Sequence, residues 1–273
     1  MPARRSRART GRARRSRVGG RRTGADDIGR RVFARETPGV LPVILAHRAG
    51  AHGGAENSLS AIRRAPELGA DGVEIDVRRT RDGVAIVMHD LIPVRTARWP
   101  IPIRWMTAKC VARLRLTNGE RVPTLADAFG AARPGLVFAV ELKEEGATGA
   151  VLDTVRSAGD GLTVQIWTND EPVVRFFARE APDLEIVLMR GEQPSDDVAG
   201  LLADAREWGA DSVAVNPRRV GAKVFDGARD AGLRVYTGFH DLEQQERILT
   251  AASPLAGFTT EWPGEARARL ARW

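Results

Sequence analysis

Three pairs of polar side chains stand at or near the ends of apolar runs in this sequence, and their types suit metal binding and proton transfer. These pairs are His47 with Arg48, Glu74 with Asp76, and Glu141 with Lys143. Residues two apart in an extended strand share a face, so both members of the second pair point in one direction, as do both members of the third. We expect all six side chains to meet where the strands end.

The acids Glu74, Asp76 and Glu141 would repel one another if they converged without a counter-charge, and their pKa values would rise. A divalent cation removes that conflict, and all-oxygen ligands select a hard ion, so we expect one Mg²⁺ or Ca²⁺. A Glu-x-Asp pair alone is more often a solvated rim paired with Arg and Lys. The third acid and the two histidines expected at the same strand ends favour the metal site.

Paired acid–base catalysis is predicted from two of the four histidines, His47 and His89. Histidine populates both protonation states near neutral pH, so one ring can act as base and the other as acid. Each such proton transfer contributes about 10²–10⁴-fold to a rate. His52, in a Gly-rich loop, and His240, after a later strand, are interpreted as background.

The sequence around Asp82-Gly83 predicts a β-hairpin, because this dipeptide between alternating β-prone runs is typical of a type I′ turn. With these two residues as the turn, Asp76 faces His89, and their Cβ atoms lie about 4.5–5.5 Å apart. A two-residue turn cannot join neighbouring strands of a parallel sheet. The second arm, residues 84–89, is therefore expected outside the main sheet.

Short apolar runs recur from residue 40 onward, with helical patterns between them. Strands are expected over residues 43–47, 73–77, 137–143, 163–168, 185–189, 212–216, 234–238 and 257–261. This rhythm of strand, helix and two short loops predicts a closed parallel (β/α)₈ barrel with a β-hairpin extension after the second strand. A short irregular insertion, residues 91–123, precedes the third strand. A doubly wound open sheet would show the same alternation, and the count of eight favours the barrel.

Local signals mark the helix boundaries. A capping box is expected from Thr124, and Pro66 is expected to kink or end the first helix. Gly69, Gly209 and Gly232 each precede a strand, where a left-handed glycine ends a helix.

The positive charge is confined to the first part of the chain. Residues 1–36 contain thirteen arginines and three acids, a net charge of +10, whereas the whole chain carries +7, so residues 37–273 carry −3. Residues 1–38 are predicted to be a disordered Arg-rich tail and residues 39–273 the barrel domain. Nucleic acid would bind only through residues 1–36, whose arginines also offer phosphate contacts to anionic lipid, and a solvated extension is the favoured interpretation.

Composition excludes several classes of protein. The single cysteine, Cys110, excludes an intramolecular disulfide, and no run approaches the ~18 apolar residues of a membrane span. No apolar segment follows the arginine pairs, so a secretory signal is not expected and a cytoplasmic location is predicted. The sequence does not indicate an oligomeric state.

An ordered set of motifs in residues 43–265 resembles that of the glycerophosphodiester phosphodiesterase family. These motifs are His47-Arg48, Glu56-Asn57-Ser58, Glu74-Ile75-Asp76, Thr80-Arg81-Asp82-Gly83, His89-Asp90, Val122-Pro123-Thr124-Leu125, Glu141-Leu142-Lys143 and Gly257-Phe258-Thr259-Thr260. The resemblance implies a (β/α)₈ barrel with a bound divalent metal that hydrolyses small-molecule glycerophosphodiesters to glycerol 3-phosphate and an alcohol.

The resemblance also implies a role for each matching residue. The implied metal ligands are Glu74, Asp76 and Glu141, the implied acid–base pair is His47 and His89, and the implied substrate contacts are Arg48, Lys143 and Glu56. The chain departs from the family pattern at Ala49, usually Gly, at Ala55, usually Pro, at Tyr236, usually Trp, and at Glu261, usually Asp. These departures bear on the alcohol that is accepted more than on the reaction.

Two other functions stay open. A related barrel phospholipase acting on intact phospholipids would need an apolar, membrane-seeking rim. The residues that could supply this rim, although they fit an ordinary cap equally well, are Trp99, Ile101, Ile103, Trp105 and Met106. A non-catalytic phosphate or nucleic-acid binder would work through the Arg-rich tail. The sequence specifies neither the head group, nor the metal, nor which histidine is the acid.

Overall fold

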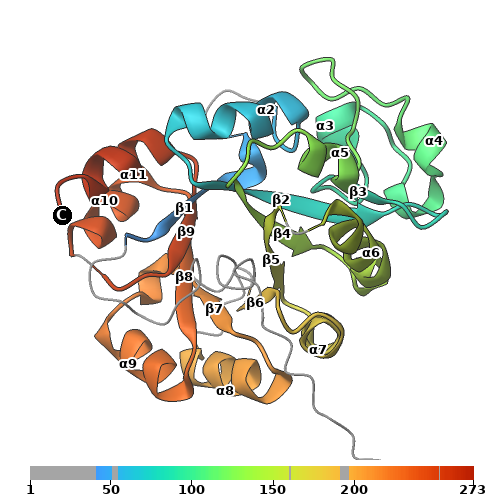
Figure 1. Cartoon of the computed structure of the whole chain (residues 1–273). Helices are drawn as coiled ribbons and strands as arrows, with labels where there is room; N and C mark the ends of the chain where they lie inside the picture. The colour runs from blue at the N-terminus through green and yellow to red at the C-terminus, as the bar shows by residue number, and fades with distance from the viewer. Residues whose placement is uncertain (1–40, 51–54, 160, 191–196, 252) are drawn as a thin grey trace, which may run out of the picture. The chain divides into compact units, whose positions relative to one another are not determined.

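A computed structural model describes residues 41–50, 55–159, 161–190, 197–251 and 253–273 of the chain (Figure 1). The predicted disordered tail, residues 1–38, lies outside the described residues, and so does His52. The boundary between tail and barrel domain therefore stays a prediction. No helix among the described residues is long and apolar enough to cross a membrane.

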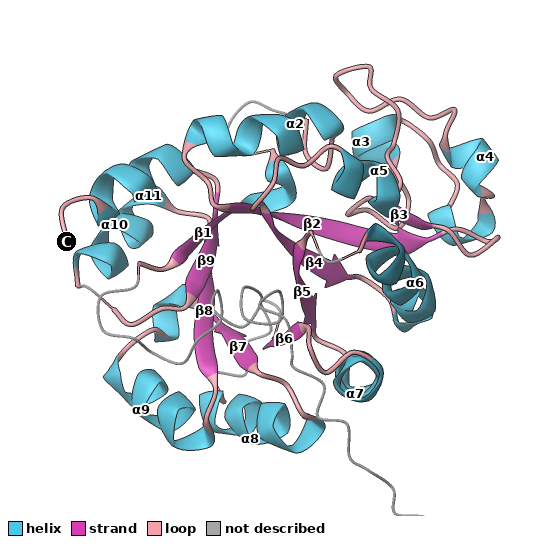
Figure 2. Cartoon of the chain, in the orientation of Figure 1, coloured by secondary structure: helices cyan, strands magenta, loops and turns pink. Residues whose placement is uncertain are grey.

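Within the described residues, eight parallel strands close into a barrel and one antiparallel strand extends it (Figure 2). The parallel strands are β1 (Val43–Ala46), β2 (Gly72–Arg79), β4 (Val137–Leu142), β5 (Thr163–Thr168), β6 (Glu185–Met189), β7 (Ser212–Val215), β8 (Arg234–Phe239) and β9 (Gly257–Thr260). They pair in the order β1-β9-β8-β7-β6-β5-β4-β2, and β1 also pairs with β2, which closes the ring. The predicted (β/α)₈ barrel is confirmed.

Helices surround the barrel (Figure 2). Among the described residues they are α2 (Leu59–Arg64), α5 (Leu125–Gly130), α6 (Thr148–Ala158), α7 (Glu171–Glu180), α8 (Val198–Trp208), α9 (Ala222–Ala231), α10 (Leu242–Thr250) and α11 (Pro263–Leu270). The capping box at Thr124 is present, and Gly69, Gly209 and Gly232 are left-handed with φ of 92°, 93° and 73°. As Pro66 predicted, α2 ends early and continues as a 3₁₀ turn, η2 (Ala65–Leu68).

Alternation along the strands separates two apolar layers. In β1, Ile44 packs in the large core beneath the helices, whereas Leu45 belongs to a smaller cluster with Ala139 and Tyr236. In β2, Ile75 belongs to the large core, so the neighbouring residues of that strand face the barrel interior. Burial on both faces explains why these strands read as short continuous apolar runs.

The hairpin arm forms as predicted, but its register differs by one residue. Strand β3 (Ala85–Val87) pairs antiparallel with β2, with Val77 opposite Val87. The predicted pairing of Asp76 with His89 is therefore wrong. The backbone N–H of Met88 donates to the carbonyl of Asp76 at 2.8 Å instead.

The turn itself explains the shift. Thr80 and Val84 pair through the Thr80 N–H and the Val84 carbonyl at 3.0 Å, so three residues form the loop and not two. Gly83 adopts φ 87° and its N–H donates to the Thr80 carbonyl at 3.0 Å, as in a three-residue hairpin loop with a left-handed glycine. The Asp-Gly signal predicts the hairpin, but it does not distinguish this loop from the two-residue turn.

The irregular insertion has a small core of its own. It contains α3 (Val94–Ala97), a 3₁₀ turn η3 (Ile103–Trp105) and α4 (Ala108–Val111). Of the five residues considered for an apolar rim, Ile103 and Met106 are buried in that core. Trp99, Ile101 and Trp105 are exposed.

Candidate active site

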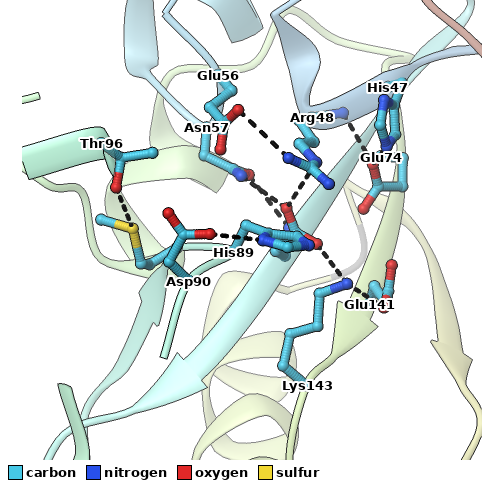
Figure 3. A network of polar contacts seen from close by, with 12 residues as sticks. His47, Arg48, Glu56, Asn57, Glu74, His89, Asp90, Thr96, Glu141 and Lys143 are labelled. Atoms are coloured by element: carbon cyan, nitrogen blue, oxygen red, sulfur yellow. Dashed lines mark hydrogen bonds and ion pairs between the residues drawn. The ribbon is translucent and has the colours of Figure 1, made fainter. Parts of the chain in front are cut away.

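Three acidic side chains meet at the carboxyl ends of β2 and β4, inside the barrel mouth. Asp76 lies directly beside Glu141 in the pairing of these strands, and Glu74 lies two residues earlier on the same face. Glu74, Asp76 and Glu141 each bring one carboxylate oxygen within 4.8 Å of the others. The structure thus brings together the three predicted metal ligands, with Lys143 beside them. Figure 3 labels Glu74, Glu141 and Lys143 in this group.

Glu74 differs from the other two acids in having a buried oxygen without a hydrogen-bond partner. Burial and the neighbouring charge of Asp76 raise its pKa to about 8. Its Oε2 accepts the Arg48 backbone N–H at 2.8 Å, whereas its Oε1 is buried without a hydrogen-bond partner. A buried carboxylate oxygen without a partner is costly, so this position favours a cationic ligand.

Asp76 is equally buried but well compensated. Its Oδ1 lies 2.8 Å from the ammonium of Lys143, which also contacts Glu141, and its Oδ2 accepts from the Asn57 amide at 2.7 Å. Burial alone would raise the pKa of Asp76, but Lys143 and the Asn57 hydrogen bond outweigh it and lower that pKa. Lys143 thus neutralises the side of the acidic cluster formed by Asp76 and Glu141.

A divalent cation fits this cluster. The donor set consists of three carboxylates, the ligand type that Mg²⁺ and Ca²⁺ prefer, and it includes the unpartnered Oε1 of Glu74. Glu74, Asp76 and Glu141 are the residues that would hold the ion.

His47 follows β1 and is held by an acid from the other end of the sequence. Its Nδ1 bonds to Glu261, which follows β9, and its ring packs edge-on against His240 with centroids 4.8 Å apart. Its Nε2 lies 3.9 Å from Glu74. Burial would lower the pKa of His47, but the Glu261 hydrogen bond and the charge of Glu74 raise it overall.

His89 follows β3 and faces the same site (Figure 3). Its Nδ1 lies 2.9 Å from Asp90 Oδ1, and its ring is about one third exposed. Although the predicted register is wrong, His89 is close enough for its charge to lower the pKa of Asp76. The two predicted acid–base histidines therefore flank the acids, each with a carboxylate on Nδ1.

A chain of ion pairs connects Arg48 to the insertion. Arg48 Nη1 lies 3.3 Å from Glu56, and Arg95 of α3 donates a hydrogen bond to each carboxylate oxygen of Glu56 at 2.7 Å. Arg95 also lies 3.0 Å from Asp90, the partner of His89. Burial would raise the pKa of Glu56, but Arg95 and Arg48 outweigh it and lower that pKa. Glu56 thus fixes two arginines at the mouth.

The loop after β1 has an unusual backbone. Arg48 and Ala49 both adopt left-handed conformations, with φ of 50° and 52°. The Asn57 N–H donates to the Arg48 carbonyl at 2.7 Å, which holds the loop against the acids. A left-handed residue favours glycine, so the alanine here occupies a strained position where the family pattern has Gly.

Four residues of the site were missed or discounted in the sequence: Asn57, Arg95, His240 and Glu261. His240 and Glu261 each follow a strand, as His47 does, so the strand-end rule applied to every strand would have found them. Asn57 lies inside the motif Glu56-Asn57-Ser58. Arg95 lies in a segment without periodicity, and nothing in the sequence signals its contacts.

The fold and the site define a (β/α)₈ barrel with an acidic, histidine-flanked site at the carboxyl ends of its strands. The sequence model of the Glycerophosphoryl diester phosphodiesterase family matches residues 47–237. The chain belongs to this family of phosphoric diester hydrolases, which confirms the predicted resemblance.

Curated relatives match a shorter segment. A glycerophosphodiester phosphodiesterase of Caldanaerobacter subterraneus is 36% identical over 94 residues, which cover 32% of this chain and 39% of that protein. Glycerophosphodiester phosphodiesterase 1 of the rat is 42% identical over 93 residues, 31% of this chain and 28% of the relative. The matched segment thus spans less than two fifths of either relative.

Solved structures share the fold over most of the chain. A glycerophosphodiester phosphodiesterase from Agrobacterium tumefaciens superposes with a TM-score of 0.70 at 22% identity, covering 85% of this chain and 100% of that one. An Oleispira antarctica phosphodiesterase, solved with its product sn-glycerol-3-phosphate, gives a TM-score of 0.74 at 19% identity, covering 85% and 97%.

Proposed function

We propose that this chain is a divalent-metal-dependent phosphodiesterase that hydrolyses glycerophosphodiesters to glycerol 3-phosphate and an alcohol. The observation that carries the proposal is the meeting of Glu74, Asp76 and Glu141 around an unpartnered buried oxygen, between two anchored histidines. Family membership and the product held by the Oleispira relative support it. Mg²⁺ or Ca²⁺ is the proposed cation, and the cytoplasm the proposed location.

The charged residues divide into two groups in this proposal. Glu74, Asp76 and Glu141 hold the cation, which when bound supplies positive charge to the phosphate oxygens. Arg48 and Lys143 contact the same phosphate and stabilise the negative charge that builds up during displacement. Arg48 lies beside Glu56 and Lys143 beside Asp76, which supports this role, because both side chains already lie at the edge of the acidic cluster.

The two histidines transfer the protons. One accepts a proton from the nucleophile, either water or the glycerol 2-hydroxyl, as its oxygen bonds to phosphorus. The other donates a proton to the oxygen of the leaving alcohol as its bond to phosphorus breaks. Where the 2-hydroxyl is the nucleophile, this step gives a cyclic phosphate, and water then opens the ring to release glycerol 3-phosphate. Glu261 and Asp90 occupy Nδ1 of His47 and His89, so each ring keeps Nε2 for the substrate.

The test is release of glycerol 3-phosphate from glycerophosphocholine and a panel of other head groups, with and without a chelator. The wild-type chain should lose activity in chelator and regain it with Mg²⁺ or Ca²⁺. His89→Ala should abolish turnover, whereas Lys109→Ala, an exposed substitution in α4, should leave it unchanged. Retention of more than about a tenth of the activity by His89→Ala would contradict the acid–base role. Cleavage of intact phospholipid vesicles in place of the soluble diesters would favour the phospholipase alternative.

A further inference from the structure

A second concave surface lies in the insertion and shares no residue with the acidic site. It is a groove of about 560 Å³ whose lining residues fall between Thr96 and Gly119. Trp99, Met106, Leu114 and Leu116 supply its apolar lining. The wall that includes Thr96 is part of α3, the same short helix that carries Arg95 to the active site.

The groove is bordered by uncompensated positive charge. Arg98, Arg113 and Arg115 line it, and all three are exposed. In the part of the chain that the structure describes, none of their guanidinium groups has an ion-pair or hydrogen-bond partner. Residues 91–121 contain seven Lys and Arg and one acid, Glu120, a net charge of +6 within a barrel domain that is negative overall.

The same segment exposes large apolar side chains. Trp99 is 40% exposed, Ile101 41% and Trp105 61%. Trp is enriched where proteins meet the headgroup region of a bilayer, and arginines beside it attract anionic lipid by about 1 kcal/mol each. A strand of nucleic acid would also attract arginines, but Trp99 is the one aromatic residue among those that line the groove, so successive bases would have no second ring to stack on.

We propose that this groove binds anionic phospholipid at a membrane surface. The three arginines contact lipid phosphate groups, and Trp99 with the aliphatic lining takes the apolar part of the lipid. This site goes beyond the proposed hydrolysis, because binding there requires neither the metal ligands nor the histidines. Contact through the insertion would hold the mouth of the barrel, where Arg95 lies, near the bilayer.

Cys110, the single cysteine of the chain, lines the groove and is exposed, so its reactivity reports occupancy in the unmodified protein. We expect vesicles of phosphatidylcholine with phosphatidylglycerol to slow alkylation of Cys110 by iodoacetamide several-fold. Vesicles of phosphatidylcholine alone and inorganic phosphate should not slow it. If only the Arg-rich tail binds the vesicles, alkylation continues at the free rate, and the proposal is overturned.

The arginine variant tests the charge. Arg113→Gln with Arg115→Gln in the full chain should weaken sedimentation with the anionic vesicles by at least about tenfold at physiological salt. The matched control is Arg206→Gln with Arg247→Gln, which removes the same charge from exposed positions on α8 and α10. Equal losses in the two variants would show a diffuse charge effect and would contradict a specific groove.

The tryptophan variant tests the apolar part. At about 0.5 M salt, where the attraction of the tail is screened, Trp99→Ala should still weaken binding, whereas Trp273→Ala, also exposed, should not. Quenching of wild-type fluorescence by brominated acyl chains, reduced in Trp99→Phe, gives the same readout without removing the aromatic ring. Binding of a single-stranded oligonucleotide that depends on Arg113 and Arg115, with vesicle binding unchanged, would overturn the proposal.

Discussion

Glu74 and Asp76 are two residues apart, equally buried and opposite in their acid–base behaviour. Asp76 has the Lys143 ammonium and the Asn57 amide as partners, so its pKa is lowered although burial opposes this. Glu74 has one backbone N–H and an unpartnered oxygen, and burial raises its pKa to about 8. The difference between the two carboxyls is therefore a difference in partners, and it identifies Glu74 as the acid that most needs a cation.

This difference predicts a pH dependence of the metal-free protein. The Glu74 carboxyl has a pKa near its usual value of 4.5 in the unfolded chain and about 8 in the folded one. Between those values the folded state holds the proton more tightly, so its contribution to stability is complete below pH 4.5 and is lost as the pH rises to about 8. In chelator, the free energy of unfolding by urea should fall across this window by up to ~1.4 kcal/mol per pH unit from this group.

Glu74→Gln provides the comparison for that slope. Gln cannot titrate and resembles the protonated carboxyl, so the two proteins should be similarly stable at low pH, and wild type should become less stable than the variant as the pH rises. Adding Mg²⁺ or Ca²⁺ should stabilise the wild type most at high pH, because the ion replaces the proton, and should stabilise the variant much less. Parallel pH curves for the two proteins would contradict the raised pKa.

Glu261 is predicted to act through His47. The bond from Glu261 to Nδ1 fixes the tautomer and orientation of the ring, so Glu261→Gln should lower kcat by about 10- to 100-fold with little change in KM. Glu261→Asp, the residue usual in the family, should recover most of the activity. Rescue by Asp separates a positioning role from a structural one, and an equal loss in both variants would contradict it.

At the scale of single residues, the sequence predicts the site well where a rule of periodicity applies. The spacing of Glu74 and Asp76 predicts a shared face, and the structure shows it. The same rule places Lys143 on the face of Glu141, but it does not predict that its ammonium would contact Asp76 or that Arg48 and Ala49 would be left-handed, because both depend on contacts between distant segments. Glu261 follows the last strand, 214 residues after His47, and only closure of the barrel brings them together.

The elements differ in how far local sequence predicts them. Each barrel strand begins within one residue of its predicted start, because an interior strand is a short apolar run between polar loops. The predicted hairpin register is wrong by one residue, because the choice between a two- and a three-residue loop depends on the hydrogen bond between Thr80 and Gly83 across the loop. The insertion is predicted only as irregular, since its short helices have no clear period.

That insertion is predicted to support the active site through Arg95. Arg95→Ala removes the bidentate partner of Glu56 and the second partner of Asp90, so Arg48 and His89 lose their common anchor. We expect kcat/KM for a water-soluble glycerophosphodiester to fall by about tenfold, while the melting temperature changes little because the Arg95 side chain is about half exposed.

Arg104→Ala is the matched control for this variant. Arg104 is exposed in the same insertion and lies over the ring of Trp105, away from Glu56 and Asp90. It should leave kcat/KM unchanged. An equal decrease in both variants would indicate that the insertion as a whole had been disturbed and that Arg95 has no particular role.

Across the whole molecule, buried acids occupy both ends of the barrel interior, but they differ in how many of their oxygens have a hydrogen-bond or ion-pair partner. At the amino end, both oxygens of the buried Glu185 have partners. Its Oε1 lies 2.8 Å from the Arg234 guanidinium and accepts from the Ser212 hydroxyl at 2.6 Å. Its Oε2 accepts from the Gln165 amide at 2.9 Å and from the Tyr236 hydroxyl at 3.2 Å. At the carboxyl end, the acids keep an unpartnered oxygen. In such barrels the carboxyl end carries the chemistry, so the amino-end network is expected to serve stability.

This contrast yields a prediction about Arg234. Arg234→Met leaves the Glu185 carboxylate buried without its cation, which should cost about 3–5 kcal/mol in the free energy of unfolding. Arg175→Met also breaks two ion pairs, but exposed ones with Glu171 and Glu207, and should cost less than about 1 kcal/mol.

The double variant distinguishes a buried charge from lost packing. Because a neutral Gln can keep hydrogen bonds to Ser212 and Gln165, Glu185→Gln combined with Arg234→Met should recover part of the stability that Arg234→Met loses. The folded fraction of each variant should cleave diesters at the wild-type rate, since the network lies at the end of the barrel opposite to His47 and His89. Additive losses, measured by urea unfolding, would show that the arginine contributes packing and not charge compensation, and a fall in turnover would show that the two ends are coupled.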